Sequence, residues 1–303
     1  MTNAIDIRSL SRVFGQVKAL EDITLSAPEG SICGLLGRNG AGKTTIMSIL
    51  AGQDRPSSGT VEVFGQDPFE NKALLSQISF IRDNQRYPDG YRLHHVLRIA
   101  PDFAPNWSSD VAAELVEGFR IPDRTPIKKF SRGQLSSVAV VLALASRAPL
   151  TLLDEPYLGL DATARAFFHN MLLRDFAEHP RTVMLSTHLI EESEALFDRV
   201  LIVDRGRVYV DCASEETSTL AFTVSGPAQV VEELVGGRTL LASHTVGGLR
   251  SVTVGGTADA GLGFRAHTLG AAVSPATLQQ LVAGYGSAAT APEPVRTNKG
   301  AHA

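Results

Sequence analysis

The sequence is poor in the features that mark secreted or membrane-spanning chains. Its 303 residues include only two cysteines, Cys33 and Cys212, which lie far apart. This spacing gives no sign of a disulfide framework and fits a reducing cytosol. The N-terminus lacks a charged segment followed by an apolar run, so we expect no signal peptide. The longest apolar stretch, Val138 to Ala145, is far shorter than a membrane span, so we expect the chain not to cross a membrane.

An excess of charge of one sign is also missing. The net charge is −4 and the sequence contains no basic block, so we expect no nucleic acid among its partners. Apolar residues make up 44% of the chain and charged residues 20%, which is typical of a globular protein. The length allows one large domain or two modest ones.

One stretch carries a strong functional signal. Residues 37–44 read GRNGAGKT and match the phosphate-binding pattern G-x-x-x-x-G-K-[ST] at every fixed position. The apolar run 31–36 predicts a buried strand before it, and residues 45–51 predict a helix after it. The glycines let backbone N–H groups surround a phosphate chain at the positive end of the helix dipole. Lys43 would reach the β- and γ-phosphates, and the Thr44 hydroxyl would bind Mg²⁺.

A second signal is the pair of acids that ends the apolar run 150–154. Asp154 at the end of a strand places a carboxylate beside the phosphate loop, where it can hold Mg²⁺. The adjacent Glu155 is repelled by Asp154 unless a cation compensates one of them, and it is then left to orient or deprotonate a water molecule. The alternative is an ordinary polar strand end before a turn at Pro156. His188 ends another strand at the same sheet edge, either as a structural residue or as a contact to the γ-phosphate.

A mostly helical insertion separates the two signals. From Leu93 to Ala148 the apolar period is helical, and Ser131 is placed to cap a helix that is apolar nearly all round. Such a helix start, with a flexible Gly133, can bind an anion, although most such starts are only structural.

Strands that alternate with helices on both sides of the insertion predict an α/β core. Beyond about residue 214, glycines and short β-prone runs predict a small α+β appendage. The predicted parts are a core of 1–83 and 150–212 with short strands within 1–30, a helical subdomain of 84–149, an accessory region of 215–286, and a disordered tail of 287–303.

Together these motifs resemble the ATP-binding cassette (ABC) ATPases over about residues 5–212. The matching segments are Gly37–Thr44 (Walker A), Ser131–Gln134 (signature), Leu152–Glu155 (Walker B with the catalytic glutamate), Gly159–Asp161 (D-loop) and His188 (switch histidine). Their order and spacing make the resemblance specific, and the signature excludes ordinary P-loop kinases and small GTPases.

The resemblance implies a P-loop NTPase (RecA-like) core with antiparallel N-terminal strands, and Mg-dependent hydrolysis of ATP. It implies a head-to-tail dimer with a second nucleotide-binding subunit, identical or different, in which Ser131 and Gly133 of one subunit complete the other's site. Glu155 would polarise the water and His188 would hold the γ-phosphate, as catalytic residues. The implied nucleotide-binding residues are Phe14, Gly37, Asn39, Gly40, Gly42, Lys43, Thr44, Thr45, Asp83, Gln85, Ser131, Gly133, Gln134 and Asp161, and the implied ligands of Mg²⁺ are Thr44 and, through water, Asp154.

Two positions leave alternatives open, and a third departs from the family's usual residue. Phe14 occupies the family's base-stacking position, but a core phenylalanine explains it equally well. The family's Q-loop glutamine falls by register on Asp83, with Gln85 two residues further on. An ionised aspartate offers oxygen to Mg²⁺ but cannot donate a hydrogen bond, so either residue could substitute, with Asp83 the first choice. Arg132 stands where the family usually has glycine, a position that tolerates basic residues in resembling subunits.

The insertion resembles ATP-binding subunits of bacterial exporters whose permease is a separate chain, through Tyr87-Pro88, residues 103–110 and residues 127–131. The resemblance implies a polytopic permease that docks near residues 83–107, a position at the cytoplasmic face of the membrane, and export of a drug, peptide or lipid.

Two other functions fit the same motifs. One is a soluble ABC ATPase acting in translation or DNA repair, which the single cassette and the short, non-heptad insertion disfavour. The other is a degenerate regulatory cassette, which the intact Lys43, Asp154, Glu155 and His188 disfavour.

Overall fold

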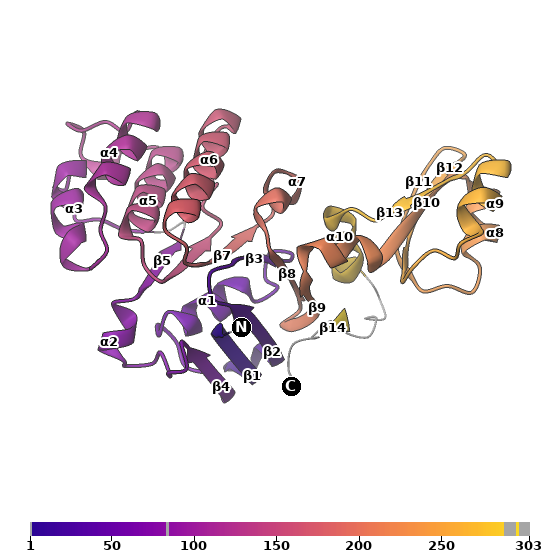
Figure 1. Cartoon of the computed structure of the whole chain (residues 1–303), viewed down its shortest axis with the longest axis horizontal. Helices are drawn as coiled ribbons and strands as arrows, with labels where there is room; N and C mark the ends of the chain where they lie inside the picture. The colour runs from indigo at the N-terminus through magenta and orange to yellow at the C-terminus, as the bar shows by residue number, and fades with distance from the viewer. Residues whose placement is uncertain (1, 83–84, 288–294, 297–303) are drawn as a thin grey trace.

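The computed structural model describes residues 2–82, 85–287 and 295–296 (Figure 1). The strands are β1 (Asn3–Phe14), β2 (Val17–Pro28), β3 (Ile32–Leu36), β4 (Ser58–Val63), β5 (Ile78–Arg82), β6 (Leu150–Asp154), β7 (Thr182–Thr187), β8 (Arg199–Asp204), β9 (Arg207–Ala213), β10 (Ala221–Pro227), β11 (Leu240–Val246), β12 (Leu249–Gly255), β13 (Ala272–Pro275) and β14 (Val295–Arg296). The α-helices are α1 (Lys43–Leu50), α2 (Lys72–Leu75), α3 (Leu93–Ile99), α4 (Ser109–Gly118), α5 (Arg132–Ser146), α6 (Ala162–Glu178), α7 (Ile190–Ser193), α8 (Ala228–Val235), α9 (Leu262–Thr268) and α10 (Leu278–Ser287).

The central sheet has the order β14-β9-β8-β3-β7-β6-β5. Strands β5, β6, β7, β3 and β8 pair in parallel, and β9 returns antiparallel to β8. Every residue of β3, β6 and β7 is buried, because these strands are covered on both faces. Their carboxyl ends therefore meet at one edge, where a ligand can reach side chains that follow each strand.

A second, antiparallel sheet of order β2-β1-β4 packs against the central sheet through α1 (Figure 1). Its β1 is one strand of 12 residues, although its sequence shows only short apolar runs. The reason lies in the register shifts between Ile7, Leu10 and Arg12, and in the positive φ of 47° at Ser9. These irregularities interrupt the apolar alternation that would reveal a continuous strand.

The helical insertion comprises α3, α4 and α5, with two short 3₁₀ turns. Helix α5 is apolar nearly all round because it packs against α4, α6 and the strands β5 and β6. The insertion forms one end of the molecule, together with α6 (Figure 1).

The accessory region contains its own sheet, of order β11-β12-β10-β13, with neighbouring strands antiparallel. Its elements follow the order strand, helix, strand, strand, helix, strand of the ferredoxin-like motif. Helices α8 and α9 pack with Phe222, Val224, Val252 and Val254 into a separate small core. The region extends away from the cassette at the opposite end from the insertion (Figure 1).

Part of the predicted disordered tail, 287–303, is ordered. Ser287 ends α10, and Val295 and Arg296 form β14, which pairs in parallel with Val210 and Asp211 of β9. The outer edge of β9 offers backbone groups with which this short strand can pair. The rest of that range lies outside the described residues. Across the part of the chain that the structure describes, no helix combines the length and apolarity that a membrane crossing requires.

Candidate functional site

The phosphate loop joins β3 to α1, and its glycines are required by close packing. Gly37 has φ 152°, and a Cβ there would lie 2.0 Å from the Val203 carbonyl oxygen. Gly42 has φ 111°, and a Cβ there would lie 2.6 Å from Leu20 Cδ2. Both positions combine a positive φ with contacts that leave no room for a side chain. The loop conformation is therefore tied to glycine at these two positions.

Lys43 is buried inside this loop, with 6% of its surface exposed. Its Nζ donates hydrogen bonds to the carbonyl oxygens of Gly37, at 2.8 Å, and Arg38, at 3.2 Å. The same atom lies 3.8 Å from Glu155 Oε1. A buried ammonium group needs such partners, and they hold Lys43 at the edge of the sheet where the acids stand.

Asp154 ends β6, and both of its carboxylate oxygens accept hydrogen bonds from hydroxyl groups. Thr44 Oγ1 donates to Oδ2 at 2.6 Å, and Ser186 Oγ donates to Oδ1 at 2.6 Å. The two predicted ligands of Mg²⁺, Thr44 and Asp154, thus lie side by side. Both offer the oxygen donors that Mg²⁺ prefers, so the donor set fits this cation. Among the described residues no cluster of three or more His, Cys, Asp or Glu side chains is placed to hold a metal, so phosphate oxygens would have to supply further ligands.

Glu155 is held in an unusual backbone conformation, with φ 51°. Its backbone N–H donates to the carbonyl oxygen of Ser186 at 3.2 Å and to its Oγ at 3.1 Å. Its Oε2 accepts from His188 Nδ1 at 2.7 Å, whereas Oε1 is buried without a hydrogen-bond partner in the described part of the chain. The carboxylate is therefore fixed in place while one oxygen keeps its accepting capacity.

A cavity of about 620 Å³ opens over the two acids. It is lined by Thr44, Gln53, Phe80, Arg82, Gln85, Arg86, Asp154, Glu155 and Leu158. Of the two Q-loop candidates, Gln85 lines this cavity, and Asp83 lies outside the described residues. Gln85 Oε1 accepts a hydrogen bond from Tyr87 Oη at 3.0 Å.

The signature residues serve their own helix in this chain. Ser131 Oγ accepts from the N–H of Gln134 at 3.2 Å, and Gln134 Oε1 accepts from the N–H of Ser131 at 2.9 Å, a reciprocal cap of α5. A Cβ at Gly133 would lie 2.3 Å from the Gly159 carbonyl oxygen, so the signature packs against the D-loop of the same chain. Asp161 caps α6 by accepting from the N–H of Ala164 at 2.8 Å. None of these residues lines the cavity over the acids.

The remaining predicted residues are Phe14, on the N-terminal sheet, and Asn39, Gly40 and Thr45, in or next to the phosphate loop. Phe14, at the end of β1, is 46% exposed, which places it outside the core. The Arg12 guanidinium lies 4.3 Å from the centre of its ring. Asn39 and Gly40 are exposed on the loop, and Thr45 follows Thr44 in the first turn of α1.

Several residues at this edge escaped the sequence-based prediction. Ser186 touches both acids, and its register opposite Asp154 in the neighbouring strand was the signal that could have found it. Arg82 and Arg86 bring positive charge to the cavity, and Gln53 brings an amide. Nothing in their local sequence distinguishes these three from ordinary surface residues.

Comparisons with known proteins give a consistent result. A family model described as ABC transporter matches residues 20–158. The daunorubicin/doxorubicin resistance ATP-binding protein DrrA of Streptomyces peucetius is 30% identical over 221 residues, which cover 71% of this chain and 67% of the relative. The aliphatic sulfonates import ATP-binding protein SsuB 2 of Rhodococcus jostii (strain RHA1) is 34% identical over 214 residues, which cover 69% of this chain and 82% of the relative. For other curated relatives the chain spans 64% of their length, just under two thirds.

The fold itself has solved counterparts. The structure of an ATP-binding subunit of an ABC transporter matches with a TM-score of 0.64 and 25% sequence identity, over 71% of this chain and 91% of that chain. This match, and the mixture of parallel and antiparallel sheets, confirm the predicted fold class.

Proposed function

Since this chain belongs to the family of ABC transporter ATP-binding proteins, we propose that it binds and hydrolyses ATP to drive a transporter whose membrane permease is a separate chain. The proposal is carried by one observation. Lys43, the Thr44–Asp154 pair and the Glu155–His188 pair come from the start of α1 and the ends of β6 and β7, and they meet at one edge of the central sheet. That arrangement combines groups for binding phosphate, holding a cation and positioning water.

Each residue has a distinct role in the proposed reaction. Lys43 exchanges its contacts with the loop carbonyls for oxygens of the β- and γ-phosphates. Glu155 uses Oε1, which has no hydrogen-bond partner in the described part of the chain, to accept a proton from the attacking water. The water oxygen bonds in line to the γ-phosphorus while the bond from that phosphorus to the β–γ bridging oxygen breaks, so that ADP and phosphate leave. His188 fixes the other oxygen of Glu155 and lies beside the γ-phosphate. Thr44 and Asp154 would hold Mg²⁺, which neutralises developing charge on the phosphates when bound.

The signature helix acts in a second subunit. In this chain Ser131 and Gly133 do not line the cavity over the acids, and the Ser131 and Gln134 side chains cap the N-terminus of α5. We propose that they complete the nucleotide site of a second nucleotide-binding subunit, where the helix N-terminus meets the γ-phosphate. The partner is either a second copy of this chain or a different nucleotide-binding subunit.

The permease docks on a second cavity, of about 600 Å³, next to the nucleotide cavity. Its walls are mainly apolar and include Tyr87, Tyr91 and Trp107, within the docking range predicted at 83–107, and Phe103, whose side chain is 76% exposed. We propose that an apolar cytoplasmic segment of the permease fills this cavity and places the chain at the cytoplasmic face of the membrane.

The two cavities share a wall. Phe80 lines both, and Gln85 of the nucleotide cavity accepts a hydrogen bond from Tyr87 of the docking cavity. Burial raises the pKa of Tyr87 to about 12, so its hydroxyl remains a donor at physiological pH. A movement of Gln85 toward the nucleotide would therefore break or displace its hydrogen bond with Tyr87 and so change the docking cavity.

The relatives differ in their direction of transport. The relatives named above include one drug-resistance protein and one import protein. We propose export of a drug, peptide or lipid, supported by the similarity to the drug-resistance protein and by the exporter-like segments of the insertion.

The experiment is to express tagged Glu155→Gln, which should bind ATP and dimerise without turnover. The complex is solubilised from membranes in mild detergent with ATP, and co-purifying proteins are identified by mass spectrometry. Glu191→Gln, an exposed acid on α7, is the matched control. A stoichiometric polytopic membrane protein that is enriched with Glu155→Gln supports the proposal. Recovery of ribosomes or DNA, or of no partner, would overturn the transport function and favour a soluble ABC ATPase.

A further inference from the structure

Helix α10, near the end of the chain, belongs to two parts of the molecule at once. Leu281 and Tyr285 are buried in the main core, and the ring of Tyr285 lies 5.9 Å from that of Tyr209 on β9. Toward the accessory sheet, Gln280 Oε1 accepts a hydrogen bond from Thr223 Oγ1 at 3.0 Å. The helix therefore joins the accessory region to the cassette.

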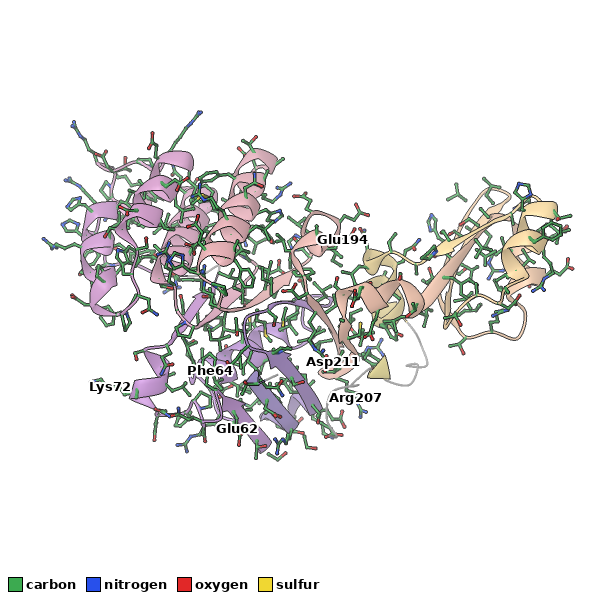
Figure 2. The ribbon with its side chains drawn as sticks, in the orientation of Figure 1. Glu62, Phe64, Lys72, Glu194, Arg207 and Asp211 are labelled. Carbon is green, nitrogen blue, oxygen red and sulfur yellow. The ribbon has the colours of Figure 1, made fainter. Side chains whose placement is uncertain are left out.

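Strand β14, which follows α10 in the sequence, also contacts the cassette. Strand β14 pairs with β9, which also packs against the N-terminal sheet. Figure 2 labels Arg207 and Asp211 on β9, along the junction between the cassette and the C-terminal part. Strand β9, before α10 in the sequence, and strand β14, after it, therefore both belong to the central sheet of the cassette.

The end of α10 contacts the phosphate loop directly. Arg38 Nη1 donates a hydrogen bond at 3.0 Å to the carbonyl oxygen of Gly286, in the last turn of the helix. Gly286 is packed so closely that a Cβ there would lie 2.7 Å from Arg38 Cδ. Carbonyl groups at a helix C-terminus carry partial negative charge, so a guanidinium group is a favourable partner for them.

The backbone of Arg38 is part of the loop that holds Lys43. Its carbonyl oxygen accepts from Lys43 Nζ at 3.2 Å and from the N–H of Ala41 at 3.1 Å. One residue therefore connects α10, through its side chain, to the phosphate-binding lysine, through its backbone. A loop fixed in this way loses less conformational freedom when a phosphate chain binds.

We propose that Arg38 is a positioning residue through which α10, and with it the C-terminal region, sets the conformation of the phosphate loop. The inference rests on the proposed binding of ATP at this loop and adds a role for the C-terminal region in nucleotide affinity. It separates two ways in which Arg38 could act: as an anchor to α10, or as a charge that attracts phosphate.

The test compares full-length variants by fluorescence titration with ATP and with ADP, in the presence of Mg²⁺. Arg38→Ala removes the anchor and the charge. Gly286→Ala keeps the charge but places a methyl group where the Arg38 side chain now lies, while improving helix propensity at that position. Arg38→Lys keeps the charge and one donor. Gly263→Ala in α9 is the control, because a Cβ there meets nothing within 4 Å.

Arg38→Ala and Gly286→Ala should each weaken the binding of both nucleotides by about threefold to tenfold, as expected for the net contribution of one intramolecular hydrogen bond. Arg38→Lys should recover part of the loss, and Gly263→Ala should bind as wild type does. In steady-state assays the two weakened variants should raise KM for ATP with little change in kcat. If Arg38→Ala weakens nucleotide binding and Gly286→Ala does not, the residue acts by its charge, and the inference is overturned. Unchanged nucleotide affinity in both variants would also overturn it. If the wild type itself fails to bind ATP, the proposed function fails instead.

Discussion

Two polar clusters stand at opposite ends of the same buried strands, and they are built from different donors. At the carboxyl ends of β6 and β7, the oxygens of Asp154 accept from the hydroxyls of Thr44 and Ser186. At the amino ends, Asp175 of α6 accepts from Arg147, which precedes β6, and from Arg181, which precedes β7. Both carboxylates are buried, at 7% and 2% exposure.

The difference lies in what each cluster can exchange. A hydroxyl is neutral, so a cation that replaces it beside a carboxylate breaks one hydrogen bond and no ion pair. Asp154 therefore remains available to a cation. The guanidinium groups hold Asp175 by charge as well as by hydrogen bonds, with Arg181 Nη1 at 2.7 Å from Oδ2 and Arg147 Nη2 at 2.8 Å from Oδ1. The type of donor around a buried acid thus separates a site prepared for a ligand from a cluster that holds the fold together.

The sharpest test of the comparison is Glu155→Gln at the nucleotide end. Removing the charge that we propose orients water should lower kcat for ATP hydrolysis by about 10²–10⁴-fold. The free energy of unfolding should stay close to that of wild type, because Gln keeps the shape of the side chain. Single-turnover hydrolysis and urea denaturation measure the two quantities. Wild-type turnover in this variant would remove Glu155 from its role.

Asp175→Asn should show the opposite pattern. It leaves two guanidinium groups without their shared anion, one of them on the buried Arg181, and should lower the free energy of unfolding by about 3–5 kcal/mol. The ATP affinity measured well below the melting temperature should not change. Asp102→Asn, an exposed acid in the insertion, is the matched control. A stable Asp175→Asn protein with impaired ATP binding would break the comparison.

Ser186→Ala should give a mixed result, because Ser186 contacts both Asp154 and the backbone of Glu155. Losing a hydrogen bond to a charged group costs about 1.5–3 kcal/mol, so we expect weaker binding of Mg-ATP together with lower stability. Titration with Mg²⁺ at fixed ATP measures the first effect, and urea denaturation the second. Ser146→Ala removes another buried serine hydroxyl, which donates to the Ala143 carbonyl and accepts from the N–H of Ala148, and should affect stability alone.

The smallest expected effect concerns His169 on α6, outside both clusters. Burial lowers the pKa of His169 below its ordinary value, and its Nε2 lies 3.1 Å from Tyr157 Oη. The unfolded chain therefore binds this proton more readily, so stability should fall as the pH drops below about 6.5 toward the folded-state pKa. His169→Gln should lose less stability than wild type between about pH 7.5 and pH 5.5 in thermal denaturation. The exposed His267→Gln should follow wild type, and an equal pH dependence in both variants would contradict the assignment.

The sequence predicted which residues meet at this edge of the central sheet, because phosphate-binding chemistry requires fixed residue types at fixed spacing. A phosphate loop cannot replace Gly37 or Gly42 when a Cβ would overlap Val203 or Leu20. The buried strands β3, β6 and β7 were also predictable, since strands covered on both faces are continuous apolar runs. At these positions the local backbone conformation and burial determine the residue type, so the sequence pattern alone was sufficient.

Contacts between distant segments could not be predicted in this way. Arg38 and Gly286 are 248 positions apart, and the acceptor is a backbone carbonyl, which any residue could provide. Arg82 and Arg86 look like surface residues until the cavity over the acids brings them into view. The arginines around Asp175 precede two different strands, so only the parallel pairing of β6 with β7 brings them together.

The positive φ of Glu155 has a consequence for any attempt to engineer this protein. A glutamate in that conformation carries strain of order 1–3 kcal/mol, which glycine would not. Selection for heat resistance alone would therefore favour glycine at position 155, and the hardier protein would have lost the carboxylate proposed to activate water. Variants of this chain that are selected for thermal stability should also be assayed for ATP turnover, because at this position a substitution that raises stability removes the proposed catalytic group.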